Sequence, residues 1–186
     1  MSQIAPLQYT IRLARRTDIP AIRSMQERSM RILGGRFYTA GEIAGFLAEF
    51  GTMDDTIVDE GHFFVAEDHH GAILASAGWS RAKPRYASGL DDGGSAAEHP
   101  TVRSVFVDPA VVRRGIGSAI MRRTEYDAAK HGLDTLRLTA TLSGVALYES
   151  LGYRSDNAME LKLPNQLRFA CVKMAKQLPK QGSLAA

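Results

Sequence analysis

Hydrophobic residues in the first third of the chain recur at the spacing of one strand and then of two helices. Alternation over residues 9–13 predicts an opening strand. Thr39 and Glu42 form a capping-box pattern, so a helix is predicted to run from there to Phe50. An earlier helix ends at the glycines at 34–35, and its inward face is predicted at Ile22, Met25, Ser29 and Ile32.

The middle of the chain has the pattern of a hairpin followed by a long connection. Two apolar runs, at 62–67 and 72–79, flank the polar segment 68–71, which is typical of a hairpin loop. Residues 81–100 are rich in Gly, Ser, Asp and Pro. A structureless connection of this length in a compact domain is usually functional or mobile.

The last third alternates between strand and helix patterns and ends in two strands. The predicted elements are strands at 101–107 and 135–139, helices at 115–131 and 143–151, and final strands at 158–163 and 168–174. The full order is therefore strand, two helices, three strands, helix, strand, helix and two strands. This order indicates an α/β or α+β fold built on one central sheet.

Length and composition are those of an ordinary globular domain. The chain has 186 residues, of which 45% are apolar, and this predicts one domain over residues 1–180 with a flexible tail at 181–186. No apolar run approaches the ~18 residues of a membrane span, so no membrane partner is expected. The N-terminus lacks the basic and apolar regions of a secretory signal. A cytoplasmic location is therefore predicted.

The charged and sulfur-containing residues exclude several other classes. There are 23 basic and 20 acidic residues, for a formal net charge of +3, and the arginines are dispersed from Arg12 to Arg168. A nucleic-acid partner is therefore not indicated. The single cysteine, Cys171, lies in an apolar run and is predicted to be buried rather than nucleophilic. No Cys/His cluster has zinc-ligand spacing, so no metal is expected.

One segment near residue 110 combines the features of an anion-binding turn. A strand ends at Val107, the chain turns at Asp108 and Pro109, and the next helix begins at Gly115 and Gly117, just after an arginine pair. Free N–H groups and the positive dipole end of a helix start attract phosphate oxygens. Glycine lets the anion approach without meeting a Cβ. The spacing fits neither the dinucleotide fingerprint nor the Walker A loop.

Residues 105–117 resemble the pyrophosphate loop of the GNAT N-acetyltransferase superfamily. A second signature, Ala-Leu-Tyr-Glu-Ser-Leu-Gly-Tyr at 146–153, is similar to a closing motif of that family, at the spacing the family requires. The resemblance is strong over 102–153. It implies a GNAT-like mixed, mostly antiparallel central sheet of about seven strands flanked by about four helices.

The resemblance also implies acetyl-CoA as acyl donor and an N-acetyltransferase activity. The backbone of Val105, Phe106 and Val107 would pair with the pantetheine arm as an added strand does. Arg122 or Arg123 would reach the phosphate on the ribose, with a solvated helix face as the alternative for each. The pyrophosphate would be held by the backbone of Arg113, Arg114, Gly115, Ile116, Gly117 and Ser118.

Tyr148 matches the position of the general acid of the family, which would protonate the coenzyme A thiolate as the C–S bond breaks. The alternative is that Tyr148 only packs in the core or on the coenzyme. Three positions depart from the family pattern: Val112 replaces Gln or Arg, Thr141 replaces Asn, and Gly144 replaces Ala or Ser. The backbone cradle survives all three departures.

The general base and the acceptor are less constrained. Glu98, His99, Asp91 and Asp92 are candidate bases in the loop before the central strand, and a solvated position is the alternative for each. Acceptor specificity is expected from the first two helices and that loop, with residues Ser29, Met30, Arg31, Tyr38, Trp79, Arg81, Arg85 and Tyr86.

A small-molecule amine is the first expectation for the acceptor, and a protein N-terminus or lysine the second. Core packing is the favoured role of Trp79. A non-catalytic acyl-CoA-binding module is the competing function, since it would use the same cradle without a proton donor. An exposed strand near the C-terminus would also allow a homodimer.

Overall fold

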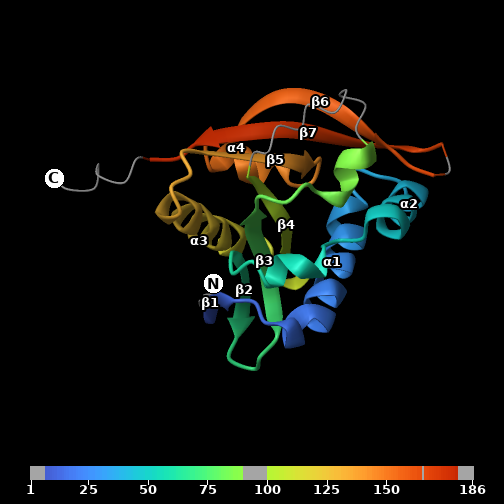
Figure 1. Ribbon diagram of the computed structural model, residues 1–186. Coiled ribbons are helices and arrows are strands. Elements are labelled where there is room, and N and C mark those ends of the chain that lie inside the picture. Colours follow the sequence, from blue (N-terminus) through green and yellow to red (C-terminus); the bar gives the residue numbers. More distant parts are fainter. Residues whose placement is uncertain (1–6, 90–99, 165, 180–186) are drawn as a thin grey trace, which may run out of the picture.

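A central sheet is the frame of the fold (Figure 1). The computed structural model describes residues 7–89, 100–164 and 166–179, and within them the sheet has seven strands. Neighbouring strands are antiparallel except β4 and β5, which are parallel. In spatial order the strands are β1 (Tyr9–Leu13), β2 (Phe63–Asp68), β3 (Ile73–Ser80), β4 (Thr101–Val107), β5 (Thr135–Thr141), β7 (Arg168–Gln177) and β6 (Arg154–Lys162).

Helices flank this sheet, as the resemblance implies. The predicted capping box of the second one is present, since the Glu42 N–H donates to the Thr39 hydroxyl at 3.2 Å and the Thr39 N–H donates to the Glu42 carboxylate at 2.7 Å. The α-helices in the described residues are α1 (Ile19–Gly34), α2 (Ala40–Phe50), α3 (Ile116–Lys130) and α4 (Val145–Ser150). Short 3-10 turns are η1 (Arg16–Asp18), η2 (Asp55–Val58), η3 (Arg85–Gly89) and η4 (Pro109–Val111).

The side chains of β2 enter two different cores, one on each face of the sheet. Phe64 and Ala66 pack in the cluster that contains the buried residues of α3, whereas Phe63 and Val65 pack in the cluster of α1. The two helices therefore cover opposite faces, with α3 on the left and α1 on the right in Figure 1. Because both faces are covered, every residue of β3 is buried.

A third apolar cluster joins α2 to the other end of the sheet. Phe169 of β7 stacks on Tyr38 at 3.9 Å and on Phe46 at 4.5 Å between ring centroids. Cys171 belongs to this cluster, and burial raises the pKa of its thiol to about 12. The prediction that Cys171 is buried is confirmed, and its raised pKa disfavours the thiolate form.

The structure differs from the sequence-based predictions in a helix face and in a strand boundary. Ile32 is 55% exposed, so it does not belong to the inward face of α1, which instead buries Gln26 and Met30. β6 begins at Arg154 rather than at 158, because backbone pairing with β7 defines it while its first residues are exposed and carry no alternation. The connection after β3 contains η3, and residues 90–99 and the predicted tail at 181–186 lie outside the described residues.

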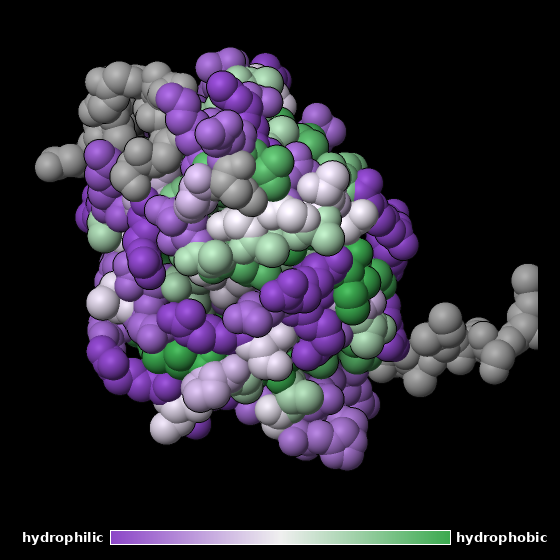
Figure 2. All heavy atoms as spheres, turned by 90° about the vertical axis from the view of Figure 1, so that its right-hand side faces the viewer, coloured by the Kyte–Doolittle hydropathy of each residue, from purple (hydrophilic) through white to green (hydrophobic). Residues whose placement is uncertain are grey.

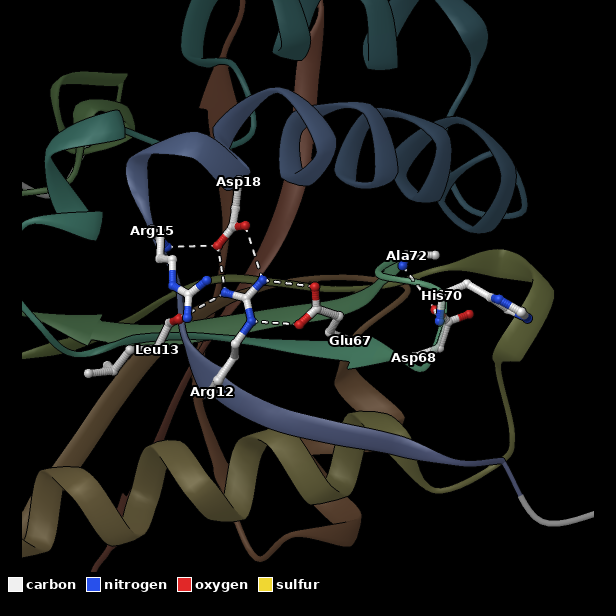
Figure 3. A network of polar contacts seen from close by, with 8 residues as sticks. All are labelled: Arg12, Leu13, Arg15, Asp18, Glu67, Asp68, His70 and Ala72. Carbon is white, nitrogen blue, oxygen red and sulfur yellow. Dashed lines mark hydrogen bonds and ion pairs between the residues drawn. The ribbon is translucent and has the colours of Figure 1, made fainter.

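An ionic network ties β1 to its neighbours (Figure 3). Arg12 lies between two carboxylates, donating to Asp18 at 2.7 Å and to Glu67 at 2.6 Å. The Asp18 carboxylate also accepts the Arg15 N–H at 2.7 Å. Hydrogen bonding to the Arg12 guanidinium lowers the pKa of both carboxyl groups. The edge strand, η1 and β2 are thereby held together by charge as well as by backbone pairing.

The molecular surface on the α1 and α2 side mixes residue types (Figure 2). Hydrophilic residues lie between the apolar ones over the face that Figure 2 turns toward the viewer. Scattered apolar side chains of this kind do not mark a partner surface. The homodimer stays a prediction. Among the described residues, no helix has the length and apolar character that crossing a lipid bilayer requires.

Candidate active site

A cavity of about 630 Å³ opens where β4 and β5 separate. The two strands pair at Thr101 and Arg137 and nowhere further along their length. Beyond that point, residues 102–107 of β4 line one wall and residues Leu138, Thr139 and Thr141 of β5 line the other. The backbone of β4 that faces this gap has no β5 partner, so it offers hydrogen-bonding groups that a ligand can satisfy.

A β-bulge turns β4 away from β5. The register of β3 and β4 shifts between Ser76 and Gly78, and Ser104 has a left-handed φ of 49°. The Ser76 hydroxyl donates to the Ser104 carbonyl at 2.8 Å, and the Ser104 hydroxyl donates to the Thr52 carbonyl at 2.9 Å. Bulges bend a strand and re-aim its residues next to functional sites. This one lies directly before Val105, at the start of the predicted pantetheine-binding stretch.

Buried polar side chains support the bulge from below. Gln26 of α1 and Ser76 of β3 are both fully buried, and the Gln26 amide donates to the Ser76 hydroxyl at 3.0 Å. Buried polar groups of this kind are costly unless they are hydrogen-bonded. Their position under Ser104 explains why α1 presents an amide to the sheet at this point.

The turn after β4 has the geometry of an anion cradle. Asp108 caps η4 by accepting the Ala110 N–H at 2.9 Å, and it also forms an ion pair with Arg28. Arg113 has a φ of 62° and Gly115 a φ of 81°, so the chain reverses sharply before α3 begins. The N–H groups of the first turn of a helix have no acceptor within it, and here the residues of that turn, 115–118, line the cavity. A Cβ on Gly115 would meet open space, so what this position requires is the left-handed backbone.

Gly117 brings the start of α3 against two other walls of the site. A Cβ at this position would lie 3.3 Å from Leu147 of α4 and 3.3 Å from Val107 of β4. The glycine therefore allows the helix start, the strand end and α4 to meet around one space.

The structure brings most of the predicted coenzyme residues to this cavity. Arg114 is exposed and is not among the lining residues. Neither Arg122 nor Arg123 lines the cavity; Arg122 is exposed, and the guanidinium of Arg123 lies 4.5 Å from the centre of the Phe64 ring. The predicted residues that do line it are Val105, Phe106, Val107, Arg113, Gly115, Ile116, Gly117 and Ser118.

Tyr148 of α4 lies in the same cavity. Its side chain is 7% exposed, and its ring meets Tyr153 edge-on at 5.8 Å between centroids. Burial raises the pKa of its phenol, so the hydroxyl keeps its proton at neutral pH. A Cβ on Gly144 would lie 2.9 Å from Cε2 of Tyr148. The departure from Ala or Ser at this position therefore makes room for the tyrosine ring.

The acceptor-side predictions divide between the cavity and the core. Ser29, Met30, Arg85 and Tyr86 line the cavity, whereas Arg31 and Arg81 are exposed elsewhere. The prediction of core packing for Trp79 is confirmed, because it is 2% exposed and its indole donates to Asp127 at 2.8 Å. Tyr38 is a structural bridge, donating to the Ala170 carbonyl at 2.6 Å and accepting the Leu142 N–H at 2.7 Å.

Sequence reasoning missed several polar lining residues, among them Asp54, Arg103 and Thr139. Asp54 is the one acidic side chain among the described residues that line the cavity, and nothing in its local sequence singles it out. Arg103 is the one charged residue of the strand Thr101–Val107, which was an available signal. Thr139 hydrogen-bonds Tyr86 and opposes the rise in its pKa that burial causes. The candidate bases Asp91, Asp92, Glu98 and His99 lie outside the described residues.

Three features of this site are typical of a coenzyme-A-dependent acyltransferase of the GNAT fold. They are a parallel strand pair that separates within a mostly antiparallel sheet, a glycine-bounded anion cradle and a buried tyrosine. The family model described as acetyltransferase (GNAT) domain matches residues 59–155. The chain belongs to this family and is an acetyl-CoA-dependent acyltransferase. The matched range contains both signatures, at 105–117 and 146–153.

Solved structures share the fold at low sequence identity. A GCN5-related N-acetyltransferase from Rhodopseudomonas palustris has a TM-score of 0.72 and 16% identity, with 95% of this chain and 100% of that chain covered. The PaiA N-acetyltransferase from Thermoplasma acidophilum in complex with coenzyme A has a TM-score of 0.65, 12% identity and coverages of 92% and 99%. A phosphinothricin acetyltransferase from Sinorhizobium meliloti in complex with AcCoA has a TM-score of 0.60 and 20% identity, with 97% of this chain and 93% of that chain covered. No curated protein matches the sequence.

Proposed function

We propose that this protein transfers the acetyl group of acetyl-CoA directly to the amine of a small molecule, with Tyr148 as the general acid. The observation that carries the proposal is the placement of Tyr148 in one cavity with the unpaired edge of β4 and the cradle before α3. A cavity of about 630 Å³ lies within the usual range of small-molecule sites. Helices α1 and α2 wall its acceptor side, which favours a compact acceptor over a protein tail.

The residues present fit acetyl-CoA. The N–H groups of the turn and helix start suit the pyrophosphate, and the open space at Gly115 leaves room for it. The β4 edge at Val105–Val107 suits the amides of the pantetheine arm. The bound donor supplies a thioester whose carbonyl carbon an amine can attack.

Each side chain then has a limited task. The amine must be neutral to attack, and it forms the C–N bond as the C–S bond breaks. The thiolate takes the phenolic proton of Tyr148, and the new amide nitrogen gives up its own proton to solvent or to a base. Because burial raises the pKa of Tyr148, the resulting phenolate is a strong base and regains a proton readily.

The test is Tyr148→Phe, assayed by free-thiol release from acetyl-CoA with an amine panel. We expect kcat to fall at least tenfold, by about 10²-fold or more if the acid acts fully. The affinity for acetyl-CoA, measured by isothermal titration, should change little because the ring remains. Tyr153→Phe is the matched control, since Tyr153 lies beside Tyr148 but does not line the cavity, and kcat should not change.

Two results would count against the proposal. An unchanged kcat in Tyr148→Phe would assign Tyr148 a packing role only. Acetyl-CoA binding by the wild-type protein without thiol release for any amine would favour the acyl-CoA-binding module instead.

A further inference from the structure

Arg103 is a partly buried cation in the wall of the cavity. Its Nε donates to the Thr101 hydroxyl at 2.7 Å and one Nη donates to the Ala82 carbonyl, so both acceptors are neutral. None of the ion pairs formed in the described part of the chain involves Arg103. A guanidinium carries five N–H donors, and those not bonded to Thr101 or Ala82 remain for a ligand.

The charged form of Arg103 is disfavoured by its removal from water. Burial lowers the pKa of Arg103, and the electrostatic influence of Tyr86, Glu60 and Asp54 opposes that effect only in part. A cation removed from water without a paired anion is costly. A negatively charged ligand group at this position would offset the free-energy cost of desolvation and accept hydrogen bonds from the planar guanidinium.

The direction of β4 indicates which ligand carries that group. The pyrophosphate cradle follows the end of β4 at Val107, and the pantetheine stretch runs back from Val107 to Val105. The thioester end of the donor is therefore expected near the bulge at Ser104, next to Arg103. A phosphate group of the donor would lie at the opposite end of the strand, so Arg103 is left for the acceptor.

The acceptor side of the cavity has an acidic and a basic side chain that could bind the two charged groups of a zwitterion. Asp54 is the acidic lining residue there and Arg103 a basic one, while Met30, Phe46 and Phe50 provide apolar walls. An ammonium group is attracted to the first and a carboxylate to the second.

We infer that Arg103 binds a carboxylate of the acceptor, so that the substrate is an amino acid or a similar amine with a carboxylate group. The inference rests on the proposed acetyl transfer in the same cavity. It makes Arg103 a residue that determines specificity for the acceptor and not for the donor.

The kinetic test compares α-amino acids with their carboxamides and with the amines that lack the carboxylate, using thiol release. For at least one amino acid, the wild-type protein should have a kcat/KM about 100-fold higher than for the carboxamide or for the amine that lacks the carboxylate. Arg103→Gln should remove this preference. In Arg103→Gln, kcat/KM for the matching carboxamide should change less than about threefold. If Arg103 had only a structural role, its substitution would instead lower kcat/KM for the acid and the carboxamide alike. Arg103→Lys should retain part of the preference because it keeps charge without the fork. Arg36→Gln, at an exposed arginine outside the cavity lining, is the charge-matched control.

A binding test separates this inference from the transfer reaction. N-acetyl amino acids and their carboxamides are titrated into the protein saturated with coenzyme A. If no amine releases thiol but the carboxylate binds at least about tenfold tighter and needs Arg103, acetyl transfer fails and the Arg103 inference stands. If acids and carboxamides are acetylated equally, or Arg103→Gln lowers both alike, the Arg103 inference is overturned while the transfer reaction stands. Absence of any carboxylate preference in both tests also overturns it.

Discussion

Two junctions of the sheet, β1–β2 at one edge and β4–β5 in the middle, differ in backbone pairing and in charge. At the β1–β2 end, five consecutive residue pairs join the strands, and Arg12 is neutralised by two carboxylates. At the β4–β5 junction, a single residue pair joins the strands, and the acceptors of Arg103 within the described residues are neutral. Figure 3 shows the hydrogen bonds and ion pairs around Arg12 in the first region.

This contrast separates stability from function. Where a charged side chain has internal partners of opposite charge, as Arg12 does, a substitution is expected to change the free energy of unfolding. Where strand pairing stops and a cation lacks an anion, the unsatisfied groups are available to ligands. Variants in the two regions should therefore have separable effects on ligand binding and on stability.

The largest effect is expected at the cradle. Gly115→Val forces a β-branched residue into a backbone with φ of 81°, so the turn must rearrange. The affinity for acetyl-CoA should fall about 100-fold, the loss of one or two charge-assisted hydrogen bonds to phosphate. Calorimetric titration measures it. Gly61→Val is the control, because Gly61 has a φ of 78° with the same open surroundings but lies outside the cavity lining. Equal losses of affinity in both variants would show that general destabilisation is responsible.

At the β1–β2 edge of the sheet, Arg12→Met should act on stability alone. It leaves Asp18 and Glu67 close together without their cation, at a cost of about 2 kcal/mol in the free energy of unfolding. Urea denaturation measures the change, and acetyl-CoA affinity should be unaltered. Arg16→Met removes the exposed partner of Asp59 and should give no resolvable change. A loss of acetyl-CoA affinity in Arg12→Met would break the separation of the two regions.

A smaller effect is expected at Gly144. The Cβ of Gly144→Ala would lie 2.9 Å from Cε2 of Tyr148, so the ring must move. We expect kcat to fall about tenfold as the proton donor is displaced, with little change in acetyl-CoA affinity. The same substitution in a Tyr148→Phe background should cost much less, since the hydroxyl is already absent. Independent, additive losses would assign Gly144 a role unrelated to Tyr148.

The smallest effect concerns pH. The folded pKa values of Asp18 and Glu67 lie below their ordinary values of 3.8 and 4.5. Their contribution to stability is therefore complete above about pH 5 and is lost as the pH falls through the folded pKa values. The stability difference between wild type and Arg12→Met should shrink by about 1 kcal/mol between pH 6 and pH 3. A difference that stays constant, or grows in acid, would contradict the charge-based account of the network.

Local features could be predicted from the sequence because neighbouring residues produce them. The capping box at Thr39, the turn after Val107 and the glycines at the start of α3 depend on residues a few positions apart. Hydrophobic periodicity likewise gave the order of the elements, and it failed where exposure hid it, as at the start of β6. Such local patterns also predicted the anion cradle and Tyr148, which the structure brings to one cavity.

The acceptor side was decided by tertiary structure. Asp54 follows α2, Arg103 precedes the bulge and Tyr86 belongs to η3, and only the packing of these elements brings the three side chains to one cavity. The bulge itself depends on Gln26 and Ser76, which lie 50 positions apart in the chain. The sequence by itself determined the glycine-bounded turn and helix start at which we propose that the phosphorylated donor binds, because this segment is made of consecutive backbone groups. What the donor meets was decided by strand register and helix packing, since no local pattern records which distant side chains face each other.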